Sequence, residues 1–119
     1  MDAGKFLKGF AYAFRGIITA VRQEPNARVH LLAAVTVLVL GVVLDVSRFE
    51  WMILVLVIGG VLAAELINSS IEELADLYSR EYHPSIEKIK DLAAGAVLVA
   101  AITALIVGLI IFLPKVVGH

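Results

Sequence analysis

The fold is decided by residues 51–76, "WMILVLVIGGVLAAELINSSIEELAD", in which an apolar run passes directly into a polar one. Residues 51–64 carry no charged side chain and have the composition of a segment inside a lipid bilayer. A membrane span needs about 20 such residues, so we expect the helix to continue through "ELINSS" before it leaves the hydrocarbon. The end of a membrane helix then carries four carboxylates, which require a chemical explanation: Glu65, Glu72, Glu73 and Asp76.

Composition favours one compact membrane domain over residues 1–119. The chain is 61% hydrophobic, whereas soluble domains contain roughly 45–50% apolar residues. The excess apolar surface must therefore face lipid or partner chains. A formal net charge of −1 argues against nucleic-acid binding, and the absence of cysteine excludes a disulfide framework and thiolate chemistry.

Residues 4–22 have the 3.6-residue periodicity of an amphipathic helix. Aromatic and aliphatic side chains, among them Phe6, Phe10 and Phe14, share one face, while lysines and arginines lie opposite. This pattern predicts a helix that lies in the membrane interface. An amphipathic helix covering a soluble core is the alternative.

Two further apolar runs complete an all-α integral membrane fold with one interfacial helix and three transmembrane helices. We expect the spans at 28–46, at 51–79 including a cytosolic extension, and at 86–114. Eight lysines and arginines lie before the first span or between the second and third, and two lie on the other side. The distribution predicts a cytosolic N-terminus and an external C-terminus.

The acids of the second span form a stripe. On a helix, Asn68, Glu72 and Asp76 fall at about −60°, −20° and +20° from Glu65, whereas Glu73 points elsewhere. A carboxylate in the bilayer core costs about 2.5–3.5 kcal/mol on insertion scales, so Glu65 needs a partner, a metal or a proton. Two explanations stay open: a polar seam that joins helices, and a site for a divalent cation such as Mg²⁺ with oxygen ligands.

Other polar residues are candidates for the same site. Lys90 is suited to donate to phosphate at the mouth of the third span, and Asp91 to pair with it; a snorkelling lysine and a helix N-terminal aspartate are the alternative. Glu24 is placed to reach the same metal or to lie in a solvated turn. His30 and His83 are expected to hydrogen-bond at the interface, because no spacing supports zinc. The glycine-rich loops that hold phosphates in many nucleotide-binding proteins are absent from the sequence.

At this point the motifs resemble those of a known family. "ELINSSIEELAD" is similar to the signature E-x-x-N-[ST]-x-I-E-x-x-x-D of the small prokaryotic lipid kinases, which comprise bacterial diacylglycerol kinases and the Gram-positive undecaprenol kinases. "EYHPSIEKIKDLAAGAVL" and "FAYAFRGI…EPNARVHL" match two further blocks. Ser69 stands where threonine is common in the undecaprenol branch, and Pro25 interrupts the segment that holds Glu24.

The resemblance implies a homotrimer in the bacterial cytoplasmic membrane whose active sites are shared between neighbouring chains. It implies transfer of the γ-phosphate of Mg-ATP to a lipid hydroxyl. By motif position Glu65 resembles the catalytic base and Asn68 its support, Glu24 and Glu72 the metal ligands, and Asp76 a supporting acid. The residues that resemble ATP contacts are Lys5, Tyr12, Glu24, Glu72, Glu81, Tyr82, His83, Lys90 and Asp91.

Within the family, "EPNARVH", the pair Glu50–Trp51 and the C-terminal apolar run are more similar to the undecaprenol kinases. The resemblance therefore predicts phosphorylation of undecaprenol, with diacylglycerol as the alternative acceptor. A small cation transporter or assembly factor is the alternative outside the class. A transporter needs polar groups throughout the bilayer, and the first and third apolar runs contain almost none.

Overall fold

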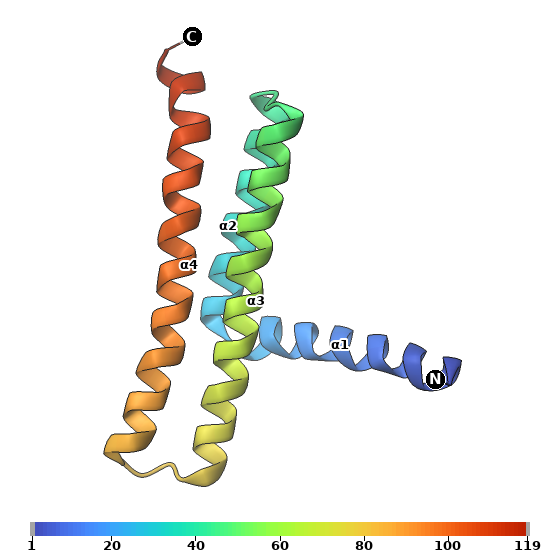
Figure 1. The fold of residues 1–119 in the computed structure, drawn as a ribbon, viewed down its shortest axis with the longest axis vertical. Coiled ribbons are helices and arrows are strands. Elements are labelled where there is room, and N and C mark those ends of the chain that lie inside the picture. Colours follow the sequence, from blue (N-terminus) through green and yellow to red (C-terminus); the bar gives the residue numbers. More distant parts are fainter. Residues whose placement is uncertain (1, 119) are drawn as a thin grey trace.

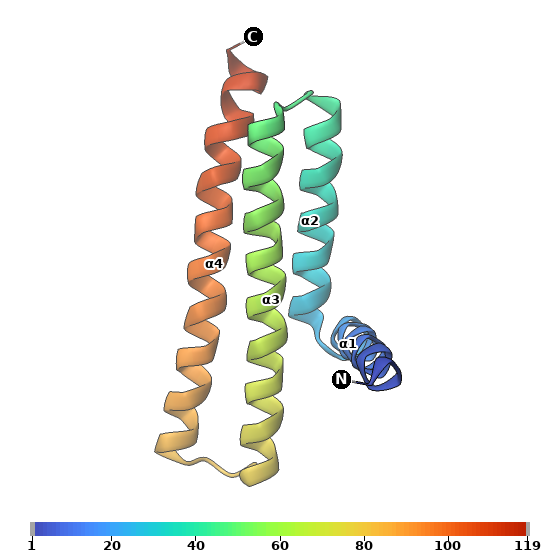
Figure 2. The ribbon, with the colours of Figure 1, turned by 45° about the vertical axis from the view of Figure 1, so that its right-hand side comes forward.

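A computed structural model describes residues 2–118 and shows four helices in this part of the chain. They are α1 (Ala3–Gln23), α2 (Pro25–Val43), α3 (Arg48–Tyr78) and α4 (Pro84–Val117). In Figures 1 and 2, α2, α3 and α4 run side by side, and α1 projects sideways from the base of α2 as a separate arm. The all-α fold with three long apolar helices is thereby confirmed.

The break between α1 and α2 consists of a single residue. Glu24 has an extended backbone (φ −111°, ψ 109°), and Pro25 opens the next helix at its first position, where the missing N–H breaks no hydrogen bond. Arg28 secures the corner, because its Nη1 donates to the carbonyl oxygens of Val21 and Arg22 at 3.0 and 2.9 Å. The proline therefore starts a new helix and fixes the point where the chain changes direction.

The other two connections are short and capped. Asp45 adopts a left-handed backbone (φ 52°) in the turn after α2, a conformation that aspartate tolerates better than most residues. Ser47 and Glu50 then form a capping box, with hydrogen bonds of 3.1 and 2.9 Å between each side chain and the other's backbone N–H. At the opposite end, the His83 side chain accepts from the Ser85 N–H at 3.2 Å and Pro84 starts α4.

Helices α3 and α4 form a long antiparallel hairpin, and side-chain ion pairs link the two helices near both ends. Near the turn between α2 and α3, Val46, Leu54 and Ile111 form the buried cluster. Close by, Lys115 of α4 pairs with Glu50 of α3 at 3.1 Å. The core is small, so most large apolar side chains of this chain remain exposed.

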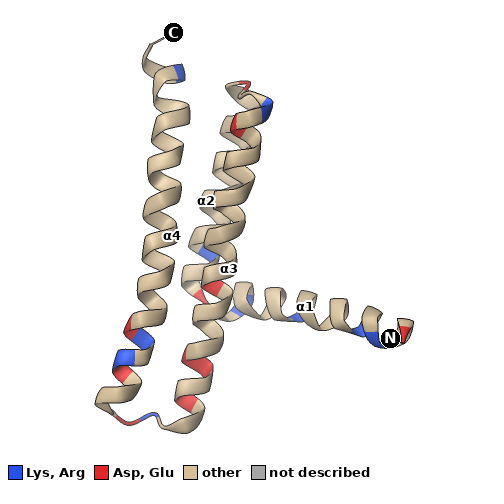
Figure 3. Ribbon diagram, viewed as in Figure 1, with Lys and Arg blue, Asp and Glu red and all other residues tan. Residues whose placement is uncertain are grey.

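The exposed apolar surface fits an integral membrane protein. Helices α2, α3 and α4 are each long and apolar enough to cross a bilayer. Figure 3 shows charged residues at both ends of α4 and none along its long middle; on α3 they lie at the start of the helix and along the half that ends at Tyr78. At 1.5 Å per residue α3 is about 46 Å long, more than the hydrocarbon thickness of about 30 Å. A span that begins at Trp51 would end near Ser70, so residues 71–78 extend beyond it; residues 71–91 are called the polar end below.

Several boundaries differ from the expected segments. Helix α2 starts at Pro25 and ends at Val43, whereas the expected span ran from 28 to 46. Helix α4 continues through Pro114 to Val117, beyond the expected end at 114. Proline in the last turn removes one hydrogen bond without stopping the helix there, and the Gly118 N–H still donates to the Pro114 carbonyl at 2.9 Å.

Candidate active site

Glu65 lies on the packing face of α3 and is 3% exposed. The same face carries the buried residues Leu54, Val61, Asn68 and Ala75. Glu65 therefore comes where the apolar part of the buried face ends and its polar part begins. A buried carboxylate is costly unless a partner compensates for its lost hydration.

The partner comes from α2. His30 Nε2 lies 3.5 Å from Glu65 Oε2, and the two side chains are 22% and 4% exposed. The sequence predicts that Glu65 needs a partner but favours only an interface hydrogen-bonding role for His30. The two residues are 35 positions apart on different helices, so no local spacing could have revealed this contact.

Two buried polar atoms one turn further along α3 have no hydrogen-bond partner among the described residues: Asn68 Oδ1 and Ser69 Oγ. Buried polar atoms are nearly always paired, so such atoms indicate a site completed by something that is not part of this chain. Ser69 lines a groove of about 740 Å³ between α1 and α3, to which Tyr12, Glu24 and Glu73 also contribute.

Glu72 is close enough to other acids for their charges to affect it. Partial burial, followed by the negative charges of Glu24 and Glu65, raises the pKa of Glu72, which lies beyond the hydrocarbon. A cation placed near these carboxylates would relieve their repulsion. No cluster of three or more metal-ligating side chains occurs among residues 2–118. This arrangement fits Mg²⁺, which is usually held by one or two carboxylates together with substrate phosphates and water.

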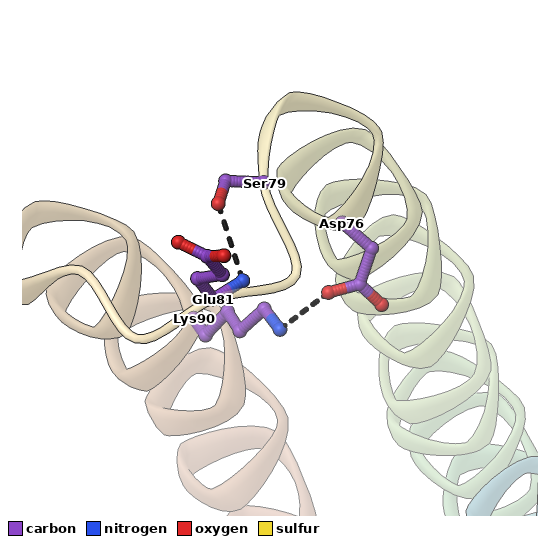
Figure 4. Close-up of polar contacts among 4 residues, drawn as sticks. All are labelled: Asp76, Ser79, Glu81 and Lys90. Atoms are coloured by element: carbon purple, nitrogen blue, oxygen red, sulfur yellow. Dashed lines mark hydrogen bonds and ion pairs between the residues drawn. The ribbon is translucent and has the colours of Figure 1, made fainter.

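Asp76 and Lys90 form the closest ion pair of the polar end. Lys90 Nζ donates to Asp76 Oδ1 at 2.7 Å and links α3 to α4 (Figure 4). This hydrogen bond lowers the pKa of Asp76 and raises the pKa of Lys90. The sequence favours Asp91, the next residue, as the partner of Lys90. The structure instead pairs Lys90 with Asp76, since consecutive helical residues point about 100° apart.

The remaining predicted ATP contacts lie in two separate places. Tyr82 and Asp91 line a shallow groove of about 570 Å³ beside the start of α4, and Glu81 and His83 are exposed in the connection before it. Lys5 and Tyr12 lie on α1, the arm that points away from the hairpin (Figure 1). Arg15 stacks on the Tyr12 ring with its Cζ 5.5 Å from the ring centre. One chain therefore does not bring Lys5 to the residues of the polar end.

Comparison with known proteins assigns the chain to a family. The family profile described as prokaryotic diacylglycerol kinase matches residues 11–112. The chain is 45% identical to the undecaprenol kinase of Bacillus subtilis (strain 168), over 96% of this chain and 93% of that protein. It is 36% identical to a diacylglycerol kinase of Synechocystis over 94% of this chain and 65% of that protein. The identity to the diacylglycerol kinase of Escherichia coli (strain K12) is 30%, over 86% of this chain and 84% of that protein.

The matched region contains Glu65, Asn68 and the whole polar end. The relatives are enzymes, so the alternative of a transporter or an assembly factor is not supported. The chain belongs to the prokaryotic diacylglycerol kinase family and is a lipid kinase.

Proposed function

We propose that this lipid kinase transfers the γ-phosphate of Mg-ATP to the hydroxyl of undecaprenol and so produces undecaprenyl phosphate. Identity to the undecaprenol kinase of Bacillus subtilis is 45%, against 36% and 30% for two diacylglycerol kinases. Diacylglycerol, which would give phosphatidic acid, is the second candidate acceptor because most of the curated relatives bear that name.

The buried Glu65 carboxylate is the observation that carries the proposal. It lies where the apolar span meets the polar end, so a lipid hydroxyl and a nucleotide can approach from opposite sides. Glu65 acts as the general base that takes the hydroxyl proton. Asn68, one turn away and with its Oδ1 unpaired, supports the reacting groups.

Glu24 and Glu72 would hold Mg²⁺ together with the phosphates of ATP. Two observations support this assignment. The two acids repel each other, and Glu72 is only partly buried, so that a cation and phosphates can reach it. When bound, the ion would neutralise the charge of the phosphates, which is a main requirement of phosphoryl transfer. Lys90, held by Asp76, contributes a fixed positive charge beside the phosphates.

The other nucleotide contacts are Glu81, Tyr82, His83 and Asp91 from the polar end, and Lys5 and Tyr12 from α1. Because Lys5 lies on an arm that projects from the hairpin, we propose a homotrimer in which α1 of one chain completes the site of its neighbour. Mixing chains that carry Lys5→Ala with chains that carry Lys90→Met would then restore activity, because some sites regain both residues. Mixtures no more active than either variant alone would contradict shared sites.

The proposed location is the bacterial cytoplasmic membrane, with α1 in the inner interface and ATP supplied from the cytosol. The exposed aromatic side chains of α1, Phe6, Phe10 and Phe14, suit the boundary between headgroups and acyl chains.

The decisive experiment gives the purified chain Mg-ATP with undecaprenol and diacylglycerol in competition and measures which lipid gains phosphate. Preferred phosphorylation of undecaprenol is the expected result. Preferred phosphorylation of diacylglycerol would favour the second candidate. Glu65→Gln should lower phosphorylation of both lipids by about 100- to 10,000-fold while the protein still assembles, and full activity of this variant would reject Glu65 as the base.

A further inference from the structure

We infer that His30 is a positioning residue for the reaction: its Nε2–H fixes the Glu65 carboxylate in the orientation that receives the proton of the lipid hydroxyl. The inference rests on the proposed role of Glu65 and adds a residue from another helix to it. It starts from the 3.5 Å approach between His30 Nε2 and Glu65 Oε2.

The packing of α2 against α3 explains why His30 can reach Glu65. The buried residues of α2 are small and recur every seven positions: Ala27, Ala34 and Gly41. Small side chains allow close approach of helices. His30 lies one turn after Ala27 and one turn before Ala34, so it shares the face that packs toward α3. The buried residues Ala27 and Ala34 on either side therefore hold the His30 ring close to Glu65.

Glu65 has no other charged partner among the residues that the structure describes. Its side chain is 4% exposed, so water cannot provide a full set of hydrogen bonds. Within the described part of the chain, His30 is therefore the one basic side chain placed to orient this carboxylate. A movement of about 0.5 Å would bring the pair to the usual hydrogen-bond distance of about 3.0 Å, and catalytic hydrogen bonds often tighten only when substrate binds.

Once shortened, this contact would give the two carboxylate oxygens different roles. Oε2 would accept the hydrogen bond from His30 Nε2, and Oε1 would be left to take the proton. In the transfer, the lipid O–H bond breaks and its proton goes to Oε1, while the oxygen's electron pair forms the new bond to the γ-phosphorus. The bond from that phosphorus to the bridging oxygen breaks and ADP leaves with the electron pair.

The test compares His30→Leu, which removes the donor, with His30→Gln, whose amide nitrogen can take the place of Nε2. The expected result is a fall in kcat of roughly 10- to 100-fold for His30→Leu, the scale of loss that misplacement of a reacting group produces. The KM values for ATP and lipid should stay within about twofold, because the contact orients the base rather than binding substrate. His30→Gln should recover most of the lost kcat.

His30→Asn keeps an amide donor but is too short to reach Oε2, so it should be as slow as His30→Leu. If His30→Leu does not fold, the comparison of His30→Gln with His30→Asn still decides, and equal activity of these two variants would overturn the inference. Wild-type activity of His30→Leu would also overturn it. Val29→Leu, a change at the exposed neighbouring position, should leave activity unchanged.

A double-mutant cycle separates failure of this inference from failure of the proposed function. His30→Leu should cause no further loss when Glu65 is already glutamine, because it acts through the carboxylate. An additive further loss would overturn the positioning role while leaving Glu65 as the base. Full activity of the Glu65→Gln variant would instead reject the proposed role of Glu65 itself.

Discussion

Four carboxylates within twelve residues of α3 occupy four different environments. Glu65 is buried beside His30, Glu72 is half-buried near Glu24, Glu73 is exposed, and Asp76 is paired with Lys90. The same functional group is therefore suited to proton transfer at one position, to cation binding at the next and to fixing a lysine at the last. These differences come from helical position and depth rather than from residue type.

Glu72→Gln tests whether Glu72 binds Mg²⁺, and a variant of the neighbouring Glu73 serves for comparison. The neutral amide keeps the shape but removes a charge that a cation would compensate, so we expect the Mg²⁺ concentration for half-maximal activity to rise at least about tenfold. Glu73→Gln is the matched control: it removes the same charge from the next residue, which lines the groove but lies about 100° around the helix from Glu72. A magnesium titration of Glu72→Gln that matches the wild type would argue against Glu72 as a ligand.

Lys90→Met tests the proposed phosphate contact. Loss of the ammonium removes a charge-assisted donor, so the KM for ATP should rise by roughly tenfold or more. Asp76→Asn should raise it less, since the lysine keeps its charge and the neutral amide oxygen still accepts from it, although more weakly than the carboxylate does. Lys115→Met, which removes a lysine from the opposite end of α4, is the control and should leave the KM for ATP unchanged. An unchanged KM for ATP in Lys90→Met would exclude the contact.

At the residue scale, the sequence was informative about position on a helix and uninformative about partners across helices. Periodicity alone separated Glu73 from the face of Glu65 and Asn68, because helix geometry is local. The contact of His30 with Glu65 and the pairing of Lys90 with Asp76 depend on how α2, α3 and α4 pack. The hydrogen bonds of Arg28 to the end of α1 likewise depend on the angle of the corner at Pro25.

At the element scale, hydropathy located the helices better than their ends. The apolar run through Leu44 suggested a span up to residue 46, yet helical hydrogen bonding stops at Val43 and Asp45 turns the chain. Membrane hydropathy follows side chains, whereas a helix ends where its backbone hydrogen bonds end. The capping box of Ser47 and Glu50 was present in the sequence and marks the start of α3 more sharply than hydropathy does.

Gly41→Ala tests the close contact between α2 and α3. A Cβ at position 41 would come within 2.5 Å of the Trp51 ring, so the indole or the helix must move. Overpacking of this kind typically costs about 1–3 kcal/mol, and we expect a lower thermal unfolding temperature in detergent. Adding Trp51→Leu should recover part of the loss, because it removes the ring that the new methyl group meets.

The control for Gly41→Ala is Gly59→Ala, since a Cβ at position 59 has no neighbour within 4 Å among residues 2–118. This variant should unfold at or above the wild-type temperature, because alanine favours helix over glycine by about 1 kcal/mol. Equal stability of Gly41→Ala and the wild type would show that α2 and α3 are less tightly packed than in the structure.

At the scale of the whole molecule, α3 and α4 are joined by one ion pair at each end. Lys115 and Glu50 approach to 3.1 Å at one end, and Lys90 and Asp76 to 2.7 Å at the other. Between these pairs lies the apolar length that would occupy the bilayer (Figure 3). In a bilayer the hairpin would have polar contacts on both sides, and the excess of lysine and arginine predicts which side faces the cytosol.

That orientation can be measured by labelling because the chain has no cysteine of its own. Ser85→Cys places a thiol in the first turn of α4 at the polar end, and Val117→Cys places one on an exposed residue at the far end of the same helix. In intact cells a membrane-impermeant maleimide should label position 117 and should reach position 85 only after permeabilisation. Both sites are exposed or at a helix end, and both variants should retain kinase activity, which serves as the control for correct insertion. The reverse labelling pattern would put the acids and Lys90 on the outer side, where no ATP is supplied, and would contradict both the orientation and the proposed nucleotide site.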